Sequence, residues 1–166
     1  MPLQAKGEFA LVNQNMEIAR ARPGQPVKNG TMAHDHDLYM LLTDAAAEHR
    51  AAAALHEYTP QLEELALRDD HRLYLAIAQR AWGVAHWLSG EYEPAEARLE
   101  RALELFRQLD TRWQAGRTHR IAGELNLENS NRDEARRHFT LALEAFEAMK
   151  ALPDLERTRA ALSELG

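Results

Sequence analysis

A repeat with a period of about 40 residues constrains this chain more than any other feature of its sequence, because a period of this length fixes the architecture of the whole array. When the 166-residue sequence is shifted by 40 positions, many residues fall on identical residues in one ungapped register. Seven of these identical pairs are Arg72 and Arg112, Arg80 and Arg120, Gly83 and Gly123, Ala95 and Ala135, Ala102 and Ala142, Glu104 and Glu144, and Phe106 and Phe146. Such a repeat is typical of proteins in which one small unit is stacked repeatedly.

The residues that recur suit a pair of closely packed helices. A glycine inside a helix costs about 1 kcal/mol relative to alanine, so Gly83 and Gly123 require a compensating contact. We expect Ala95 and Ala135 to provide it, because small residues on facing helices let the two axes approach closely. The repeat therefore predicts helical hairpins that meet at these glycines.

Turn and cap signals mark the ends of the helices. Gly90 suits a helix C-terminus, and Pro94 is tolerated only in the first turn of the helix that follows. Thr111 with Gln114, and Asn131 with Glu134, have the spacing of capping boxes. The pattern predicts helices at residues 73–88, 92–109, 112–128 and 132–149, which is an all-α fold.

These residues carry a resemblance to a known family. The spacing of Gly83, Ala95, Leu99 and Ala102, its recurrence one period later, and the turn sequence from Ser89 to Ala97 resemble the tetratricopeptide repeat. The period exceeds the roughly 34 residues that are usual in that family and is similar to the longer repeats of LuxR/MalT-type regulators, bacterial cyclase-associated regions and kinesin light chains. The resemblance implies an α-solenoid of antiparallel helix pairs that acts as a scaffold or sensor, as in bacterial regulatory systems.

The geometry of that family predicts a groove for a partner, because the first helix of each unit lines the concave face. The groove residues that this projection predicts are Ile77, Arg80, Val84, Trp87, Arg117, Arg120, Glu124 and Leu127. The arginines either form a strip that grips the carboxylates of a protein or peptide partner, or pair within the groove with Glu124, Glu128 and Asp44. Trp87 is either an anchor for the partner or part of the core.

The resemblance does not extend to the basic and Asn residues with which chaperone-binding members of this family hold two carboxylates of a chaperone C-terminus. The matching positions hold Met40, Asp44 and Ala81, and only Arg117 has the required charge.

The domain boundaries follow from the period. Repeats are expected at about residues 32–71, 72–111 and 112–151, and residues 153–166 are expected to cap the last repeat. In the first, degenerate repeat, Pro60 either interrupts a helix that begins near Ala51 or starts a new helix capped by Thr59; we favour the second arrangement. Residues 1–31 form an arm or linker that is either disordered or packed along the repeats or a neighbouring protomer.

Composition excludes several classes of function. Residues 1–31 hold four basic and two acidic side chains, which is a net charge of +2. Because the whole chain has a net charge of −6, the remaining residues have a net charge of −8. Such an acidic body would repel a nucleic acid backbone. No apolar run is long enough to span a bilayer, and the chain has no cysteine, so we expect a cytoplasmic protein that does not insert into a membrane.

No motif predicts catalysis. The chain lacks a phosphate-binding loop and a nucleophile elbow, and its acidic residues lie among arginines on polar helix faces. The eight histidines, with His34 and His36 closest together, lack the spacing of a metal site. We therefore expect a protein-binding scaffold that needs no cofactor and no metal. The alternative is a structural protein that forms homo-oligomers through helix faces and the N-terminal arm.

Overall fold

A computed structural model describes residues 32–165 of the chain. From His36 onward the described residues form one compact unit, which the account below concerns. The arm predicted over residues 1–31 lies outside the described residues.

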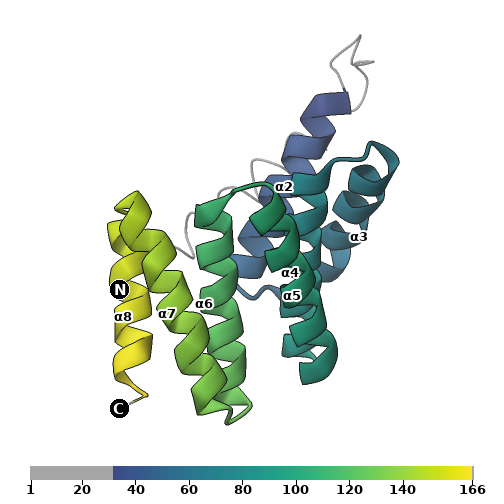
Figure 1. Ribbon diagram of the computed structural model, residues 1–166. Helices are drawn as coiled ribbons and strands as arrows, with labels where there is room; N and C mark the ends of the chain where they lie inside the picture. The colour runs from purple at the N-terminus through teal and green to yellow at the C-terminus, as the bar shows by residue number, and fades with distance from the viewer. Residues whose placement is uncertain (1–31, 166) are drawn as a thin grey trace. The chain divides into compact units, whose positions relative to one another are not determined.

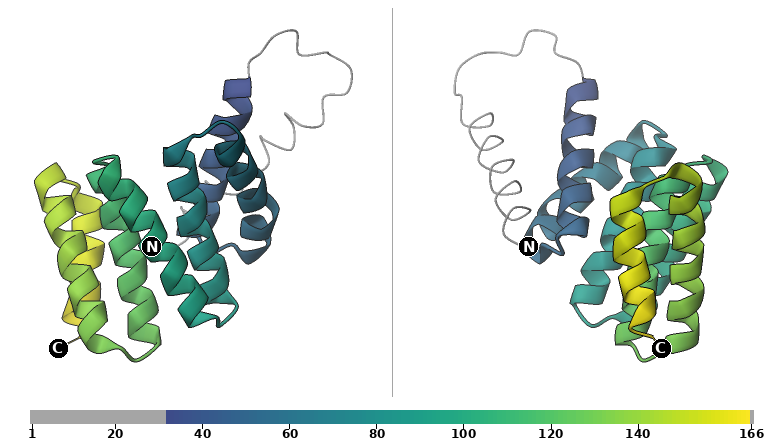
Figure 2. Two further views of the ribbon diagram at one scale, coloured as in Figure 1. Left: turned by 45° about the vertical axis from the view of Figure 1, so that its right-hand side comes forward. Right: turned by 90° about the vertical axis from the view of Figure 1, so that its left-hand side faces the viewer.

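The described part of the chain is an all-α solenoid in which each helix from residue 52 onward packs against the next (Figures 1 and 2). Its helices are α2 (Met32–Glu48), α3 (Ala52–Arg68), α4 (Arg72–Leu88), α5 (Tyr92–Gln108), α6 (Arg112–Glu128), α7 (Arg132–Met149) and α8 (Leu152–Ser163). Residues 32–165 contain no strand. The starts of successive helices are evenly spaced along the chain, and this spacing is compatible with helical pairs of the predicted period.

One residue in each turn adopts the left-handed conformation that lets the chain reverse between two helices. These residues are Arg50, Asp70, Gly90, Asp110, Ser130 and Lys150, with φ between 50° and 77°. The residue after each of them donates its backbone N–H to a carbonyl five positions earlier, as Glu91 does to His86 and Thr111 to Phe106. This bond satisfies a carbonyl that the helix end would leave unpaired.

The two predicted capping boxes are wrong. Neither Thr111 nor Asn131 accepts a backbone hydrogen bond with its side chain. The hydroxyl of Thr111 instead donates to the carbonyl of Phe106, and the side-chain oxygen of Gln114 accepts from Arg80. Both side chains of the first predicted capping box, Thr111 and Gln114, therefore form other hydrogen bonds.

The glycines do lie at close helix contacts, but their main partners are larger than alanine. A Cβ on Gly83 would lie 2.7 Å from Cγ of Leu99 and 3.2 Å from the carbonyl oxygen of Ala95. A Cβ on Gly123 would lie 2.6 Å from the ring of Phe139, and Ala135 is not among its nearest neighbours. The prediction that Ala95 and Ala135 complete these contacts is corrected: each glycine receives the side chain four positions beyond the alanine.

Pro60 lies inside α3, so the favoured arrangement with a new helix at Pro60 is wrong. The helix carries four buried side chains, which are Leu55, Thr59, Leu62 and Ala66. Their spacing of three and four positions runs through the proline without a break. The packing of this stripe outweighs the hydrogen bond that proline cannot donate.

The last helix covers the open face of the final repeat. Leu155 packs in a cluster with Ala142 and Phe146, and Leu165, just after α8, packs with Ala135 and Phe139. This is the arrangement that a terminal unit of a stacked array needs, because its core would otherwise face water. Within residues 32–165, no helix combines the length and the apolar character that a membrane span requires.

Candidate functional site

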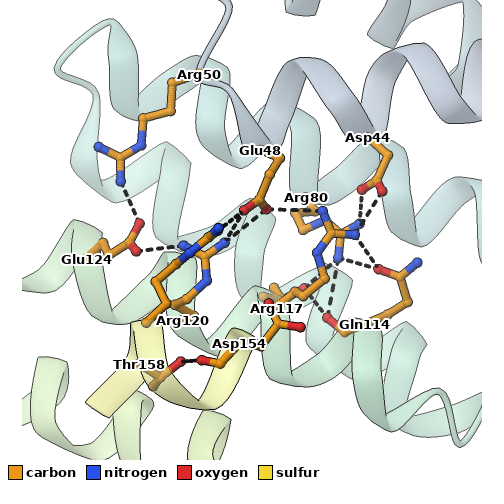
Figure 3. A network of polar contacts seen from close by, with 12 residues as sticks. Asp44, Glu48, Arg50, Arg80, Gln114, Arg117, Arg120, Glu124, Asp154 and Thr158 are labelled. Carbon is orange, nitrogen blue, oxygen red and sulfur yellow. Dashed lines mark hydrogen bonds and ion pairs between the residues drawn. The ribbon is translucent and has the colours of Figure 1, made fainter. Parts of the chain in front are cut away.

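Polar side chains of α2, α4, α6 and α8 meet on one side of the solenoid. Asp44 and Glu48 lie one turn apart on α2 and point toward arginines of α4 and α6 (Figure 3). We call the connected group the arginine cluster. Its members are Asp44, Glu48, Arg50, Arg80, Arg117, Arg120, Glu124 and Arg157.

Arg80 is the most deeply buried member, with no exposed surface. It pairs with Asp44 and donates to Oε1 of Gln114 at 2.7 Å, while its guanidinium lies 5.2 Å from the ring centroid of Phe106. Burial lowers the pKa of Arg80 to about 10, although the negative charge of Asp44 acts to raise it. The side chain therefore stays charged at neutral pH, and Asp44 is what compensates it.

Asp44 also binds the next arginine along the face. Its second oxygen accepts from Arg117 at 2.8 Å, so one carboxylate serves guanidinium groups from two helices. The guanidinium of Arg117 also lies 4.6 Å from the centroid of the Trp113 ring. Side chains of α2 and α6 thus meet directly, although three helices of the chain separate them.

Glu48 connects three helices. It accepts from Arg117 at 3.1 Å, from Arg120 at 2.9 Å and from Arg157 of α8 at 2.5 Å. Burial alone would raise the pKa of Glu48, but the charges of these arginines outweigh it and lower the pKa to about 2. Its ionised form therefore holds α2 to α6 and α8.

The predicted groove residues all lie on α4 and α6, and most of them are covered. Ile77 and Val84 are each 1% exposed and belong to the core. Arg80, Arg117 and Arg120 are buried in ion pairs, so of the two roles predicted for the arginines, pairing within the groove is present. Two details of that prediction differ: Glu48 is a central partner, and Glu128 instead accepts from Tyr92.

Trp87 packs in the core at 4% exposure, which is the second of the two roles predicted for it. The guanidinium of Arg50 lies 4.1 Å from the centroid of its ring. Trp87 also borders an open cavity of about 420 Å³ beside the cluster. Its lining also includes Glu124, Leu127, Arg157, Ala160 and Ala161, of which Glu124 and Leu127 are half-buried.

Sequence reasoning missed Glu48, Arg50 and Arg157, although the sequence carries a signal for two of them. Glu48 follows Asp44 by four positions and so shares its helix face. Arg157 lies one period after Arg117, at the same repeat position, within the segment that was expected only to cap the array. Arg50 lies in a turn, where the helical period gives no direction for its side chain.

A second group of polar side chains lies on the other side of α6. Nδ1 of His119 and Nδ1 of His138 are 2.9 Å apart. Burial first, and then neighbouring positive charges, lower the pKa of both imidazoles to about 4. The two rings are thus neutral at pH 7, and one donates to the other.

We expect this histidine pair to make the fold sensitive to acid. In the unfolded chain the imidazoles take up protons near pH 6.5, whereas in the folded state they do so only near pH 4, so stability is present above pH 6.5 and is lost as the pH falls toward 4. The free energy of unfolding should fall by about 2 kcal/mol for each of the two imidazoles between pH 7 and pH 5. Urea unfolding at a series of pH values measures this loss.

The preceding repeat supplies the control variant. The positions one period earlier hold Gln79 and Arg98, which form a hydrogen bond of 2.8 Å without a group that titrates in this range. His119→Gln combined with His138→Arg should therefore remove most of the change between pH 7 and pH 5. An unchanged pH dependence in the double variant would contradict the assignment to this pair.

The described residues contain no group of three or more His, Asp or Glu side chains placed to hold a metal ion.

Residues 74–148 match the family model described as "Tetratricopeptide repeat". A search of the curated proteins found no match to this chain.

Proposed function

We propose that this chain, of which residues 74–148 match the tetratricopeptide repeat, is a non-catalytic scaffold that holds a partner protein or peptide. Repeats of this family generally mediate interactions between proteins. The partner binds along the face shared by α2, α4, α6 and α8, beside the arginine cluster. The observation that carries this proposal is the excess of positive charge in that cluster.

The cluster contains five arginines and three carboxylates, and so has a net charge of +2 within a region of the chain that is otherwise acidic. A cation that is held partly buried attracts an anionic group more strongly than one surrounded by water, because screening is weaker there. This supports a partner with acidic groups.

Two arginines at the edge of the cluster are the ones that a partner can reach. The side chains of Arg50 and Arg157 are 44% and 56% exposed, and each is held by a single carboxylate. Both line the 420 Å³ cavity, whose apolar part includes Leu127, Ala160 and Ala161. The site therefore fits an acidic side chain next to an apolar one.

Binding of a labelled peptide of alternating Glu and Leu, followed by fluorescence anisotropy, tests the site. Arg157→Ala should weaken binding about fivefold to tenfold, the equivalent of about 1 to 1.4 kcal/mol. Arg159→Ala is the matched control, because Arg159 lies on the same helix with 59% exposure but pairs with Glu147, away from the cluster. Equal losses in the two variants, or equal binding of a Lys and Leu peptide, would contradict a specific acidic site.

The alternative function, homo-oligomerisation, has one supporting observation. Trp113 and Met149 are 39% and 49% exposed and line a second open cavity, of about 500 Å³. Exposed apolar groups of this size are common at contacts between proteins. Sedimentation velocity at the concentrations of the binding experiment separates the two functions: a stable dimer that Trp113→Ser dissociates would favour the alternative.

A further inference from the structure

A third cavity lies between α5, α6 and α7, on the side of α6 that faces away from the arginine cluster. Its volume is about 470 Å³, and Leu103, Phe106 and Ala115 form the apolar part of its lining. At about 100° per residue, Ala115 and His119 both lie about 160° around α6 from Arg117. The cavity is therefore separate from the proposed partner site.

The cavity follows from a difference between repeats. Ala115 is at the position that Leu75 holds one repeat earlier, and Leu103 is at the position of Glu63. In the earlier repeat Glu63 accepts from Gln79 and from the indole of Trp82, so that region is occupied by a polar network. The later repeat has a methyl group and an apolar side chain instead, and this leaves space with an apolar lining.

The histidine pair supplies a hydrogen-bond donor to this space. Arg137 lies 3.2 Å from Nε2 of His138, and because an arginine can only donate, that nitrogen carries no proton. The proton of His138 is then on Nδ1 and is donated to Nδ1 of His119. The remaining proton of His119 is therefore on Nε2.

This Nε2–H is available to a ligand. Among residues 32–165, no group accepts a hydrogen bond from it, and the enclosed side-chain atoms without a partner are three others: Thr43 Oγ1, Thr59 Oγ1 and Arg120 Nε. His119 and His138 both line the cavity. A donor nitrogen that is neither enclosed nor paired can reach a molecule bound there.

The charged group that acts on the donor is the guanidinium of Arg137, which also pairs with Glu134 at 2.6 Å. After burial, the groups that lower the pKa of His119 are His138 and Arg137, and no carboxylate is among the causes. At the rim, Glu104 is paired with Arg107, and Asp110 contacts only Nε of Arg112, at 3.4 Å. The two Nη groups of Arg112 remain available, while Glu100 is the one rim carboxylate without an ion pair among the described residues.

We propose that this cavity binds a small organic anion with an apolar body, of the class of aliphatic carboxylates. The chain of the ligand lies against Leu103, Phe106 and Ala115, and its carboxylate accepts from Nε2 of His119. Most small-molecule sites have this composition, an apolar lining with a few placed polar groups in a volume of about 300 to 1,000 Å³. The site is independent of the binding of a protein partner.

Titration with octanoate tests the proposal, with ¹⁵N NMR of the imidazoles as the readout. We expect saturable binding that shifts the His119 Nε2–H signal, and at least fivefold weaker binding of 1-octanol, which has the same chain without the charge. Ala115→Leu places the residue of the preceding repeat in the cavity and should weaken octanoate binding at least tenfold. Its melting curve shows whether the fold is retained.

Leu103→Glu is the second variant, because it brings a carboxylate into the apolar lining and should also abolish binding, whether or not Ala115→Leu folds well. Leu67→Ala, at a position of α3 that is 63% exposed and lines none of the three cavities, should leave octanoate binding unchanged and serves as the control. Absence of a saturable shift at His119, or equal affinity in the wild type, Ala115→Leu and Leu103→Glu, would overturn the proposal.

Discussion

Asp44→Ala should destabilise the protein by about 3 to 5 kcal/mol, because the substitution leaves buried positive charge without compensation. Asp44 is the carboxylate that pairs with fully buried Arg80 and also with Arg117, which is 6% exposed. The desolvation of these two guanidinium groups remains when the carboxylate is removed. Chemical unfolding with urea measures the loss.

Arg80→Met is the matched control for Asp44→Ala. It removes the other half of the same ion pair, but Asp44 keeps its bond to Arg117 and no buried charge is left alone. We therefore expect a smaller loss, about 1 to 2 kcal/mol, and the double variant should be more stable than Asp44→Ala alone. If Asp44→Ala and Arg80→Met cost the same, compensation of buried charge is not the reason for the effect.

Gly123→Ala should destabilise the protein by about 3 kcal/mol, although alanine favours a helix by about 1 kcal/mol over glycine. The new Cβ would lie 2.6 Å from a ring carbon of Phe139, and that ring is completely buried and cannot move aside. Overpacking therefore outweighs helix propensity. Thermal and urea unfolding of the variant measure the balance.

Phe139→Ala provides the background that isolates this contact. Phe139→Ala creates a cavity and is itself destabilising. In the Phe139→Ala background, however, Gly123→Ala should no longer destabilise the protein and should add part of the free energy by which alanine favours a helix over glycine. A double-mutant cycle with no coupling between the two positions would contradict the close contact between Gly123 and the ring.

The sequence allowed the helices to be predicted closely because their signals are local or periodic. The helices at Arg112–Glu128 and Arg132–Met149 agree residue for residue with the prediction, and two others differ by one residue at one end. The family resemblance is confirmed over residues 74–148. Pro60 was placed wrongly because its local effect was weighed above the stripe of buried side chains that continues through it.

The candidate site was less predictable because it depends on how far successive repeats rotate. The sequence places Arg80, Arg117 and Arg120 on one face, but only the structure brings Glu48 of α2 to the arginines of α6 and α8. The pairing of His119 with His138 likewise depends on the contact between two antiparallel helices. Side chains that meet across helices distant in the chain leave no periodic signal in the sequence.

The contacts of Glu48 change how an array of this kind should lose its structure. In a linear stack each unit touches only its neighbours, so an end can fray while the middle remains folded. Here one carboxylate near the start of the array is bonded to Arg157 in its last helix. Opening of the final hairpin must break this bond, so fraying of the last helix should cost up to about 1 kcal/mol more than in a stack without it.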